Sequence, residues 1–395
     1  IKDKFIETKK NLDKISPSMC LAKWKQVTLH LQTGHTHSCH HPVPHKIPLE
    51  EIKIDPSALH NTSFKKKQRQ KMLEGIRPKE CDYCWIAEDA DTNGTTYSDR
   101  ITKSSEDWAA PYLKEVTNKS WIDNVNPSYV EVSFSNVCNF KCSYCSPQVS
   151  SKWMEEIKEH GPYPTSTKFN NLKTIAQEDK MPILHKDINP YVDAFWKWWP
   201  ELYPNLHTLR LTGGEPLMSK DCWQVLEAIR DNPRDDLVLA VNTNLDVEPK
   251  LLERFVEIAK QIGPNIKEFQ IFTSGESTGA AAEYARFGLN YDRWYKNCDW
   301  VLSELFGKFK MVFAFMTTVN ILSVGSYDLF LKDVLKLRAK YIKHKDDGNL
   351  LPCMSNFLRY PNFLAICNLD DALAVPIPIP VPLSVPIFLT SYCLL

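Results

Sequence analysis

The sequence predicts an α/β fold built around a parallel β-sheet. Strand-length runs of apolar, β-branched and aromatic residues occur at 129–136, 206–212, 237–243, 267–273 and 310–319, with a weaker run at 351–358. Helix-like segments separate these runs, and strands that alternate with helices form βαβ units. A cysteine run and a Gly-Gly turn follow directly after two of the strands, at the ends where parallel α/β folds place their active sites.

Capping and stop signals bound the expected helices. Ser150 or Ser151 caps a helix over Ser151–His160, which Gly161-Pro162 ends. The other helices expected between the strands are Trp223–Arg230, Pro249–Gln261 and Tyr291–Leu305.

In the N-terminal part of the chain, a helix is expected from Phe64 to Glu74, with Ser63 as its cap. The basic run Lys65–Lys71 is expected to form its solvated face. A contact with nucleic acid is the less favoured alternative for this run.

Three cysteines, Cys138, Cys142 and Cys145, form a C-x3-C-x2-C run. Thiolates at this spacing can hold three irons of a [4Fe–4S] cluster and leave the fourth open to a ligand. Electron-transfer clusters and structural zinc sites are usually closed by four ligands. A zinc knuckle, or buried cysteines that act as small hydrophobes, are the alternatives. A run of only three cysteines therefore favours a cluster that takes part in a reaction over a closed electron-transfer cluster or a structural zinc site.

The segment Leu209-Arg-Leu-Thr-Gly-Gly-Glu-Pro216 is a short apolar strand that ends in a Gly-Gly turn. Gly213 and Gly214 allow the backbone to approach a ligand closely. The carboxylate of Glu215, followed by Pro216, can accept hydrogen bonds from an ammonium group. Alone, this motif is a common β-to-α turn, but its place after the cysteine run is hard to explain by coincidence.

With both motifs in this order, the chain resembles the radical S-adenosylmethionine (SAM) superfamily. The resemblance covers about residues 125–360 and implies a partial (β/α)6 TIM-like barrel. It implies that Cys138, Cys142 and Cys145 hold a [4Fe–4S] cluster. It also implies that Tyr144 lies near the adenine of SAM, and that the turn Gly213, Gly214, Glu215 and Pro216 binds its amino group.

Polar residues follow two further strands. Thr243 and Asn244 end the third strand and Ser274 ends the fourth, which puts hydroxyl and amide groups at the barrel mouth. In related enzymes a serine here and an arginine soon after bind the SAM carboxylate, a pattern that Ser274 and Arg286 fit. A surface helix residue is the alternative for Arg286. Sulfatase-maturing relatives have Ser-x-Asp-Gly where this chain has Thr-Ser-Gly-Glu, which weakens any transfer of their substrate.

The N-terminal segment, 1–105, has a second cysteine set: Cys20, Cys39, Cys81 and Cys84. Four cysteines with a terminal C-x2-C can close a metal site. Their spacing resembles the auxiliary-cluster module called SPASM, or its shorter form called twitch, although that module usually follows the barrel. The alternative is a structural zinc site, supported by nearby His35, His37, His40 and His41. These histidines are also candidates for proton donors in a substrate pocket, or for a solvated loop.

Composition excludes some partners. Lys plus Arg equals Asp plus Glu at 48 each, which gives no electrostatic case for nucleic acid or a membrane surface. Twelve cysteines without a secretory signal favour a reducing, cytoplasmic compartment and metal binding over disulfides. The uncharged, proline-rich tail at 372–395 is expected to be disordered, or to be an artefact of the reading frame.

The resemblance implies an enzyme that cleaves SAM and abstracts a hydrogen from its substrate. A peptide or protein side chain is the first choice of substrate and a small polar metabolite the second. A non-enzymatic zinc-binding module is the alternative from another class. An electron donor such as flavodoxin or ferredoxin is implied, and no catalytic acid or base can be named from the sequence.

Overall fold

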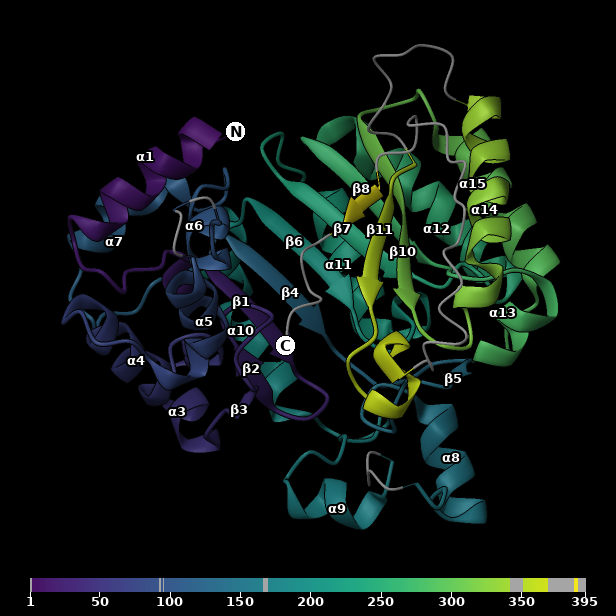
Figure 1. Ribbon diagram of the computed structural model, residues 1–395, viewed down its shortest axis with the longest axis horizontal. Helices are drawn as coiled ribbons and strands as arrows, with labels where there is room; N and C mark the ends of the chain where they lie inside the picture. Colours follow the sequence, from purple (N-terminus) through teal and green to yellow (C-terminus); the bar gives the residue numbers. More distant parts are fainter. Residues whose placement is uncertain are drawn as a thin grey trace. The chain divides into compact units, whose positions relative to one another are not determined.

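The computed structural model describes residues 2–91, 94, 96–165, 170–341, 351–368 and 387–389. The chain divides into two compact units, coloured by sequence in Figure 1. Unit 1 comprises Ile1–Phe134 and Lys186–Arg210, and unit 2 comprises Ser135–His185 and Leu211–Leu395. Unit 1 therefore extends beyond the expected 1–105 segment. Most of the expected tail lies outside the described residues.

Unit 1 contains short helices and a small sheet. Its helices are α1 (Lys2–Asp13), α2 (Ala22–Lys25), α3 (Leu49–Ile54), α4 (Ser63–Leu73), α5 (Asp82–Ala90), α6 (Asp99–Ser104), α7 (Leu113–Thr117) and α10 (Pro190–Leu202). Its strands are β1 (Gln26–His30), β2 (His35–His37), β3 (His45–Lys46) and β4 (Tyr129–Ser133), and β6 (Thr208–Thr212) begins in it. Strand β1 runs parallel to β4 and antiparallel to β2.

Helix α4 corrects two expectations from the sequence. Its cap is Thr62, whose hydroxyl accepts the N–H of Lys65 at 3.1 Å. The basic run is not a solvated face, because Lys65 and Arg69 are buried. The loop before the helix supplies their partners: Lys65 Nζ lies 2.9 Å from His60 Nδ1, and Arg69 Nη1 donates to the side chain of Asn61 at 2.8 Å.

Unit 2 contains the longer parallel strands. Its helices are α8 (Ser151–His160), α9 (Leu172–Gln177), α11 (Lys220–Asp231), α12 (Pro249–Ile262), α13 (Gly279–Ala285), α14 (Tyr291–Leu305) and α15 (Tyr327–Tyr341). Its strands are β5 (Lys141–Cys142), β7 (Val238–Thr243), β8 (Glu268–Ser274), β9 (Arg286–Phe287), β10 (Met311–Val319), β11 (Cys353–Phe357) and β12 (Ile387–Leu389).

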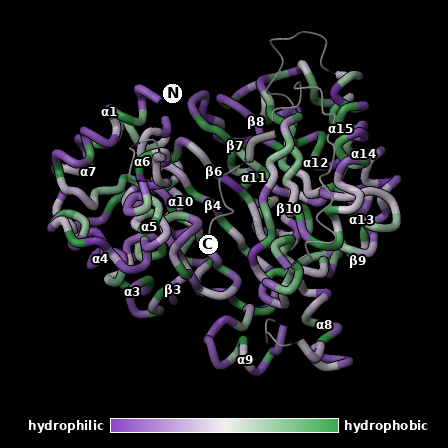
Figure 2. Tube along the Cα trace, viewed as in Figure 1, coloured by the Kyte–Doolittle hydropathy of each residue, from purple (hydrophilic) through white to green (hydrophobic). Residues whose placement is uncertain are grey.

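The order β7-β8-β10-β11-β12 is parallel throughout. Opposed residues such as Val241, Ile271 and Phe313 are fully or almost fully buried and form its core. Hydrophobic and hydrophilic residues alternate around helices such as α12 and α14 (Figure 2), so one side of each can cover the sheet. The predicted α/β class with a parallel sheet is confirmed, and the expected strands are present as β4, β6, β7, β8, β10 and β11.

Among the described residues, no helix combines the length and apolar character needed to cross a membrane.

Candidate functional site

The loop with the three-cysteine run is fastened to the start of α8. The hydroxyl of Ser151 accepts the backbone N–H of Cys138 and donates to the backbone oxygen of the same residue, both at 3.2 Å. Ser150 caps the helix by accepting the N–H of Trp153 at 3.2 Å, as the sequence predicted. The indole of Trp153 donates to the carbonyl of Cys142 at 2.8 Å. The helix start therefore fixes the loop that carries the thiols.

The thiols of this loop lie in a poorly solvated environment. Cys138 and Cys142 are buried and Cys145 is partly buried. Burial raises the pKa of Cys138 to about 12. A hydrogen bond between the other two sulfurs lowers the pKa of Cys142 and raises the pKa of Cys145. Metal binding would release these protons, because the thiolate is the form that binds metal.

The Gly-Gly-Glu-Pro turn packs directly on the cysteine loop. Gly213 has φ +130°, a conformation that favours glycine. A Cβ on Gly214 would lie 2.3 Å from the carbonyl oxygen of Val137. The N–H of Gly214 donates to the carbonyl of Ser135 at 3.3 Å, and the N–H of Glu215 donates to that of Val137 at 2.7 Å. The two motifs singled out in the sequence are thus in contact.

The carboxylate of Glu215 is buried and well supplied with donors. Its Oε1 accepts the Thr243 hydroxyl at 2.7 Å and the N–H of Leu217 at 3.0 Å, and its Oε2 accepts the N–H of Asn244 at 2.7 Å. The buried Pro216 starts the 3-10 turn that carries the Leu217 N–H. Burial raises the pKa of Glu215 to about 7, although these donors favour its charged form. A carboxylate has about four lone-pair positions, so about one is left for a ligand.

Asn139, between the first two cysteines, ties the loop to the end of β7. Its Oδ1 accepts the side-chain amide of Asn244 at 2.8 Å, and its own amide donates to the carbonyl of Asp246 at 2.8 Å. The carboxylate of Asp246 pairs with Arg293. Sequence reasoning found Asn244 but missed Asn139 and Asp246, whose only signal was their closeness to the motifs.

Tyr144 and Arg286 meet at a carboxylate that sequence reasoning did not select. The hydroxyl of Tyr144 donates to Glu276 Oε1 at 3.0 Å. Arg286 donates to the same carboxylate through Nε at 3.0 Å and through Nη2 at 2.5 Å. Glu276 and Arg286 are both buried. The signal for Glu276 was its position in the Thr-Ser-Gly-Glu segment at the end of β8.

Arg286 is a strand residue rather than a surface helix residue. It belongs to β9, which pairs antiparallel with β5 so that Arg286 lies opposite Cys142. Ser274, at the end of β8, lines a small cavity together with Glu276, Arg286 and Tyr291. The structure therefore brings Ser274 and Arg286 to one cavity, where the arginine is already paired with a carboxylate of the protein.

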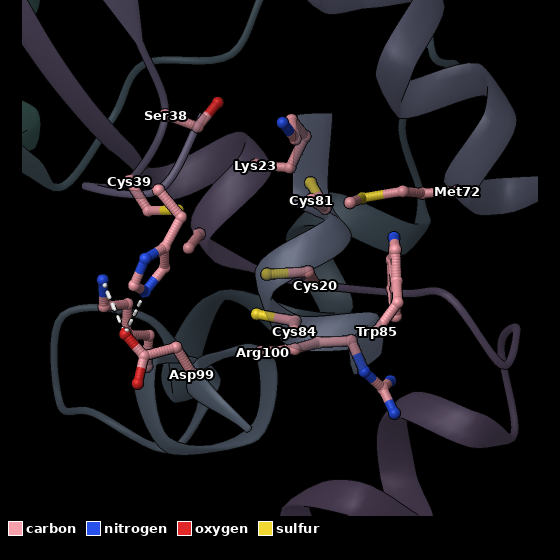
Figure 3. Close-up of a pocket in the computed structure, with 13 residues that line it drawn as sticks. Cys20, Lys23, Ser38, Cys39, Met72, Cys81, Cys84, Trp85, Asp99 and Arg100 are labelled. Atoms are coloured by element: carbon pink, nitrogen blue, oxygen red, sulfur yellow. Dashed lines mark hydrogen bonds and ion pairs between the residues drawn. The ribbon is translucent and has the colours of Figure 1, made fainter. Parts of the chain in front are cut away.

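The four N-terminal cysteines line one cavity in unit 1 (Figure 3). The sulfurs of Cys20, Cys81 and Cys84 point toward its centre, and the sulfur of Cys39 faces them from the other side. Burial raises the pKa of Cys20 and raises that of Cys81 to about 12. Cysteines distant in the sequence thus line the same cavity.

Two buried cations accompany these cysteines. Lys23 lines the cavity and pairs with Glu80. Burial opposes the charge of Lys23, but Cys81 and Glu80 outweigh it and raise its pKa. Arg100 also lines the cavity and pairs with Glu88 at 2.8 Å. Positive charge beside the sulfurs favours their thiolate forms.

Of the four neighbouring histidines, His41 lines this cavity. Its Nε2 lies 2.8 Å from a carboxylate oxygen of Asp99. His37 is buried in β2 with its Nε2 at 3.0 Å from that of His30, and His35 is also buried, whereas His40 is exposed. The expectation of a solvated loop is therefore wrong for His35, His37 and His41, whose side chains are largely shielded, while His40 is exposed.

The cysteine sets fit a sulfur-ligated metal centre by their chemistry. Among the residues that the structure describes, no three His, Cys, Asp or Glu side chains are already arranged around a single ion. A cluster of four irons is larger than one ion, so its ligands stand farther apart. Buried thiols that face one cavity suit zinc and iron–sulfur centres alike.

Comparison with known proteins found no family model that matches the chain. It is similar to GTP 3',8-cyclase of Nautilia profundicola, at 28% identity over 116 residues, which are 29% of this chain and 27% of that protein. It is also similar to GTP 3',8-cyclase of Yersinia pestis, at 32% identity over 29% of this chain and 26% of that protein. The chain thus spans about a quarter of the length of these relatives.

Two solved structures of SuiB from Streptococcus suis also match. The SAM-bound form has a TM-score of 0.36 at 13% identity and covers 75% of this chain and 52% of that one. The form bound to precursor peptide SuiA has a TM-score of 0.36 at 11% identity and covers 78% and 56%.

The cysteine loop, with the Gly-Gly-Glu-Pro turn packed on it, combines the two motifs that carry the resemblance to the radical SAM superfamily. The similarity to the two GTP 3',8-cyclases, over 29% of this chain, supports that superfamily.

Proposed function

We propose that the chain is an enzyme that cleaves SAM reductively and abstracts a hydrogen from a substrate, with a [4Fe–4S] cluster held by Cys138, Cys142 and Cys145. The observation that carries the proposal is the packing of Gly214 on Val137, which brings the Gly-Gly-Glu-Pro turn against the cysteine loop. A zinc knuckle closed by cysteines alone needs no such contact.

The remaining site residues have separate parts in this proposal. The bound cluster supplies an electron and an open iron for SAM. Glu215 accepts hydrogen bonds from the SAM ammonium, at the lone-pair position that its protein donors leave free. Tyr144 lies beside the adenine, and Ser274 with Arg286 binds the carboxylate. Both residues lie around one small space at the end of β8.

Thr243 and Asn244 act through Glu215. Both donate to its carboxylate, so they orient it and favour its charged form. Gly213 and Pro216 set the shape of the turn that presents it. The site therefore binds an ammonium more tightly when Glu215 has lost its proton.

A peptide or protein side chain is the first proposal for the substrate, by resemblance to the family. A small polar metabolite is the second, and the relatives named GTP 3',8-cyclase favour it. Incubation of the reduced protein and SAM with GTP, or with a peptide library, separates the two by which one yields a new product.

The four N-terminal cysteines are proposed to bind a second iron–sulfur cluster, with structural zinc as the alternative. Their convergence on one cavity supports a shared metal centre of either kind. We also propose a cytoplasmic protein that receives electrons from a flavodoxin or ferredoxin, since reduction requires an external donor.

Anaerobic protein reduced with dithionite tests the proposal. It should be brown and should convert SAM to 5′-deoxyadenosine and methionine, slowly even without a substrate. Replacement of Cys138, Cys142 and Cys145 by alanine should abolish this conversion. The matched control replaces Cys222, Cys298 and Cys353, which are buried in the same unit outside the motifs.

The control variant should keep its colour and most of its activity. Colourless wild-type protein with zinc and no iron would instead support the non-enzymatic zinc module. SAM cleavage that persists in the triple variant of the loop would contradict the assignment of the cluster ligands.

A further inference from the structure

Arg286 faces a proposed cluster ligand across a two-residue β-ribbon. Strands β5 and β9 pair so that Cys142 and Arg286 are directly opposed. Arg286 Nη1 lies 3.8 Å from the sulfur of Cys142, within the range of an N–H···S hydrogen bond. The guanidinium thus points one donor at the sulfur.

The other donors of this guanidinium are held by Glu276. Nε and Nη2 of Arg286 contact both carboxylate oxygens, and the hydroxyl of Tyr144 donates to the same group. Arg286 also lies over the ring of Tyr144, with 5.5 Å to the centroid. Arg286 and Glu276 are 6% and 1% exposed, so this arrangement cannot swing into solvent without breaking a buried ion pair.

The guanidinium group of Arg286 is planar, and Glu276 holds two of its nitrogens, Nε and Nη2. The direction of the third nitrogen, Nη1, is therefore fixed as well. Lysine has no equivalent, because an ammonium is a point charge without a fork. Glu276 therefore both neutralises Arg286 and fixes the aim of Nη1 at Cys142.

We infer that Glu276 is a positioning residue that holds Arg286 as a hydrogen-bond donor to the Cys142 sulfur, and that this donor raises the reduction potential of the cluster. The inference rests on the proposed function. Hydrogen bonds to ligand sulfurs and nearby positive charge stabilise the more negative, reduced state of a cluster. Reduction adds one electron from dithionite to the cluster, and no bond is made or broken in the protein.

This role differs from binding the SAM carboxylate, because it operates before SAM arrives. In the carboxylate role, Arg286 must release part of Glu276 to accept a second carboxylate. In the role inferred here, Arg286 acts on the cluster through the contacts that the structure shows. A change in the position of its guanidinium should therefore alter the cluster even in the absence of SAM.

The test is a redox titration of the cluster-loaded, SAM-free protein, followed by the EPR signal of the reduced cluster. Arg286→Lys keeps the positive charge but removes the planar set of donors. Glu276→Asp keeps the carboxylate but shortens the side chain by one methylene, which moves the carboxylate away from Arg286. Both variants should shift the midpoint to more negative potential, so that several-fold less cluster is reduced at a fixed potential near the wild-type midpoint. The matched control is Arg254→Lys, which alters another arginine–carboxylate pair of unit 2, that with Glu227, and should leave the midpoint unchanged.

The affinity for SAM is measured on the same samples. A midpoint unchanged in both Arg286→Lys and Glu276→Asp overturns the inference, and a weaker SAM affinity in that case assigns Arg286 to the carboxylate. Glu276→Asp remains a test if Arg286→Lys does not load iron. Failure of the proposed function has another signature, since the wild type and the variant without Cys138, Cys142 and Cys145 would then contain the same reducible clusters.

Discussion

At the scale of single residues, Glu215 shows how burial and hydrogen bonding oppose each other. Burial moves its pKa up to about 7, whereas three donors from the protein favour the carboxylate. The outcome is a group that titrates near neutrality. An ammonium ligand would supply the charge that burial disfavours, so binding and deprotonation are coupled.

The affinity for SAM should therefore depend on pH. Below pH 7 the folded protein holds Glu215 protonated, and a neutral carboxyl attracts an ammonium weakly. We expect the dissociation constant to rise up to about tenfold per pH unit as the pH falls below 7. Glu215→Gln should weaken binding about tenfold or more at pH 8, since charge-assisted bonds contribute roughly 1.5–3 kcal/mol.

Calorimetric titration of the cluster-loaded protein with SAM at several pH values checks this. A glutamine amide cannot titrate, so the Glu215→Gln variant should show a flat profile in the same range. A wild type with equal affinity at pH 6 and pH 8 would mean that the turn has a structural role only.

Partners far apart in the chain explain which site residues the sequence could not reveal. The cysteines, Gly214 and Glu215 were found because they stand in short motifs. Glu276 was missed because its role depends on Arg286 and Tyr144, which approach it only in the folded chain. The buried Lys65 was placed on a solvated face for another reason: its partner His60 is only five residues away, but local composition does not reveal that both would be buried.

At the scale of elements, local signals located the main parallel strands and several helices. Helices α8 and α14 have the bounds that caps and periodicity predicted, because Ser150 and Asn290 satisfy the first free N–H groups. Strands β7, β8 and β10 differ from the predicted runs by only one residue at their ends. Their positions could be predicted because strands of a parallel sheet are buried on both faces and therefore consist of continuous apolar runs.

The contact between the turn and the cysteine loop gives a prediction for Gly214. Gly214→Ala adds a methyl group 2.3 Å from a carbonyl oxygen, so the backbone of one segment must move. We expect a cost of about 1–3 kcal/mol, as for overpacking in a core. The melting temperature should fall by several degrees, and iron incorporation should decrease.

Gly325→Ala is the matched control, because a Cβ there meets nothing within 4 Å. Thermal unfolding and iron analysis of both variants give the comparison. Equal iron content and stability in Gly214→Ala and the wild type would contradict a tight contact between the two motifs.

At the scale of the whole molecule, the division into two units was only partly predictable. Cysteine spacing predicted an N-terminal metal-binding region apart from the expected barrel. It did not show that unit 1 includes β4 and the segment Lys186–Arg210. That segment returns to unit 1 after Ser135–His185, which belongs to unit 2. Such crossings depend on tertiary packing and leave no local pattern.

Each of the two units should bind its own share of the metal in the protein. Replacement of Cys20, Cys39, Cys81 and Cys84 by alanine should reduce iron from about eight to about four per chain, if each set binds four irons. Unit 1 should also become sensitive to protease, because a structural metal contributes on the order of 10 kcal/mol to folding. SAM cleavage should partly survive.

Iron and zinc analysis with limited proteolysis measures these effects. Wild-type protein with about four irons and one zinc would assign structural zinc to the N-terminal cysteines. Protein with four irons and no zinc would mean that these cysteines bind no metal.

The buried histidines of unit 1 make it the acid-labile part of the protein. Burial lowers the pKa of His37 to about 2 and of the half-buried His45 to about 3, and it lowers that of His60 well below its usual range. The unfolded chain binds these protons near pH 6.5, so the stability of unit 1 is lost as the pH falls below that value.

The slope is about 1.4 kcal/mol per pH unit for each histidine that stays neutral when folded. Glu215 in unit 2 has the opposite dependence, because its raised pKa gives stability that is lost as the pH rises toward 7. Hydrogen exchange at pH 5 and pH 7.5 should show unit 1 losing protection first, and equal protection of unit 1 at both values would contradict this. Mild acid would then loosen unit 1 while unit 2 keeps its structure, and neutral to slightly alkaline buffers would preserve the N-terminal cysteine site during purification.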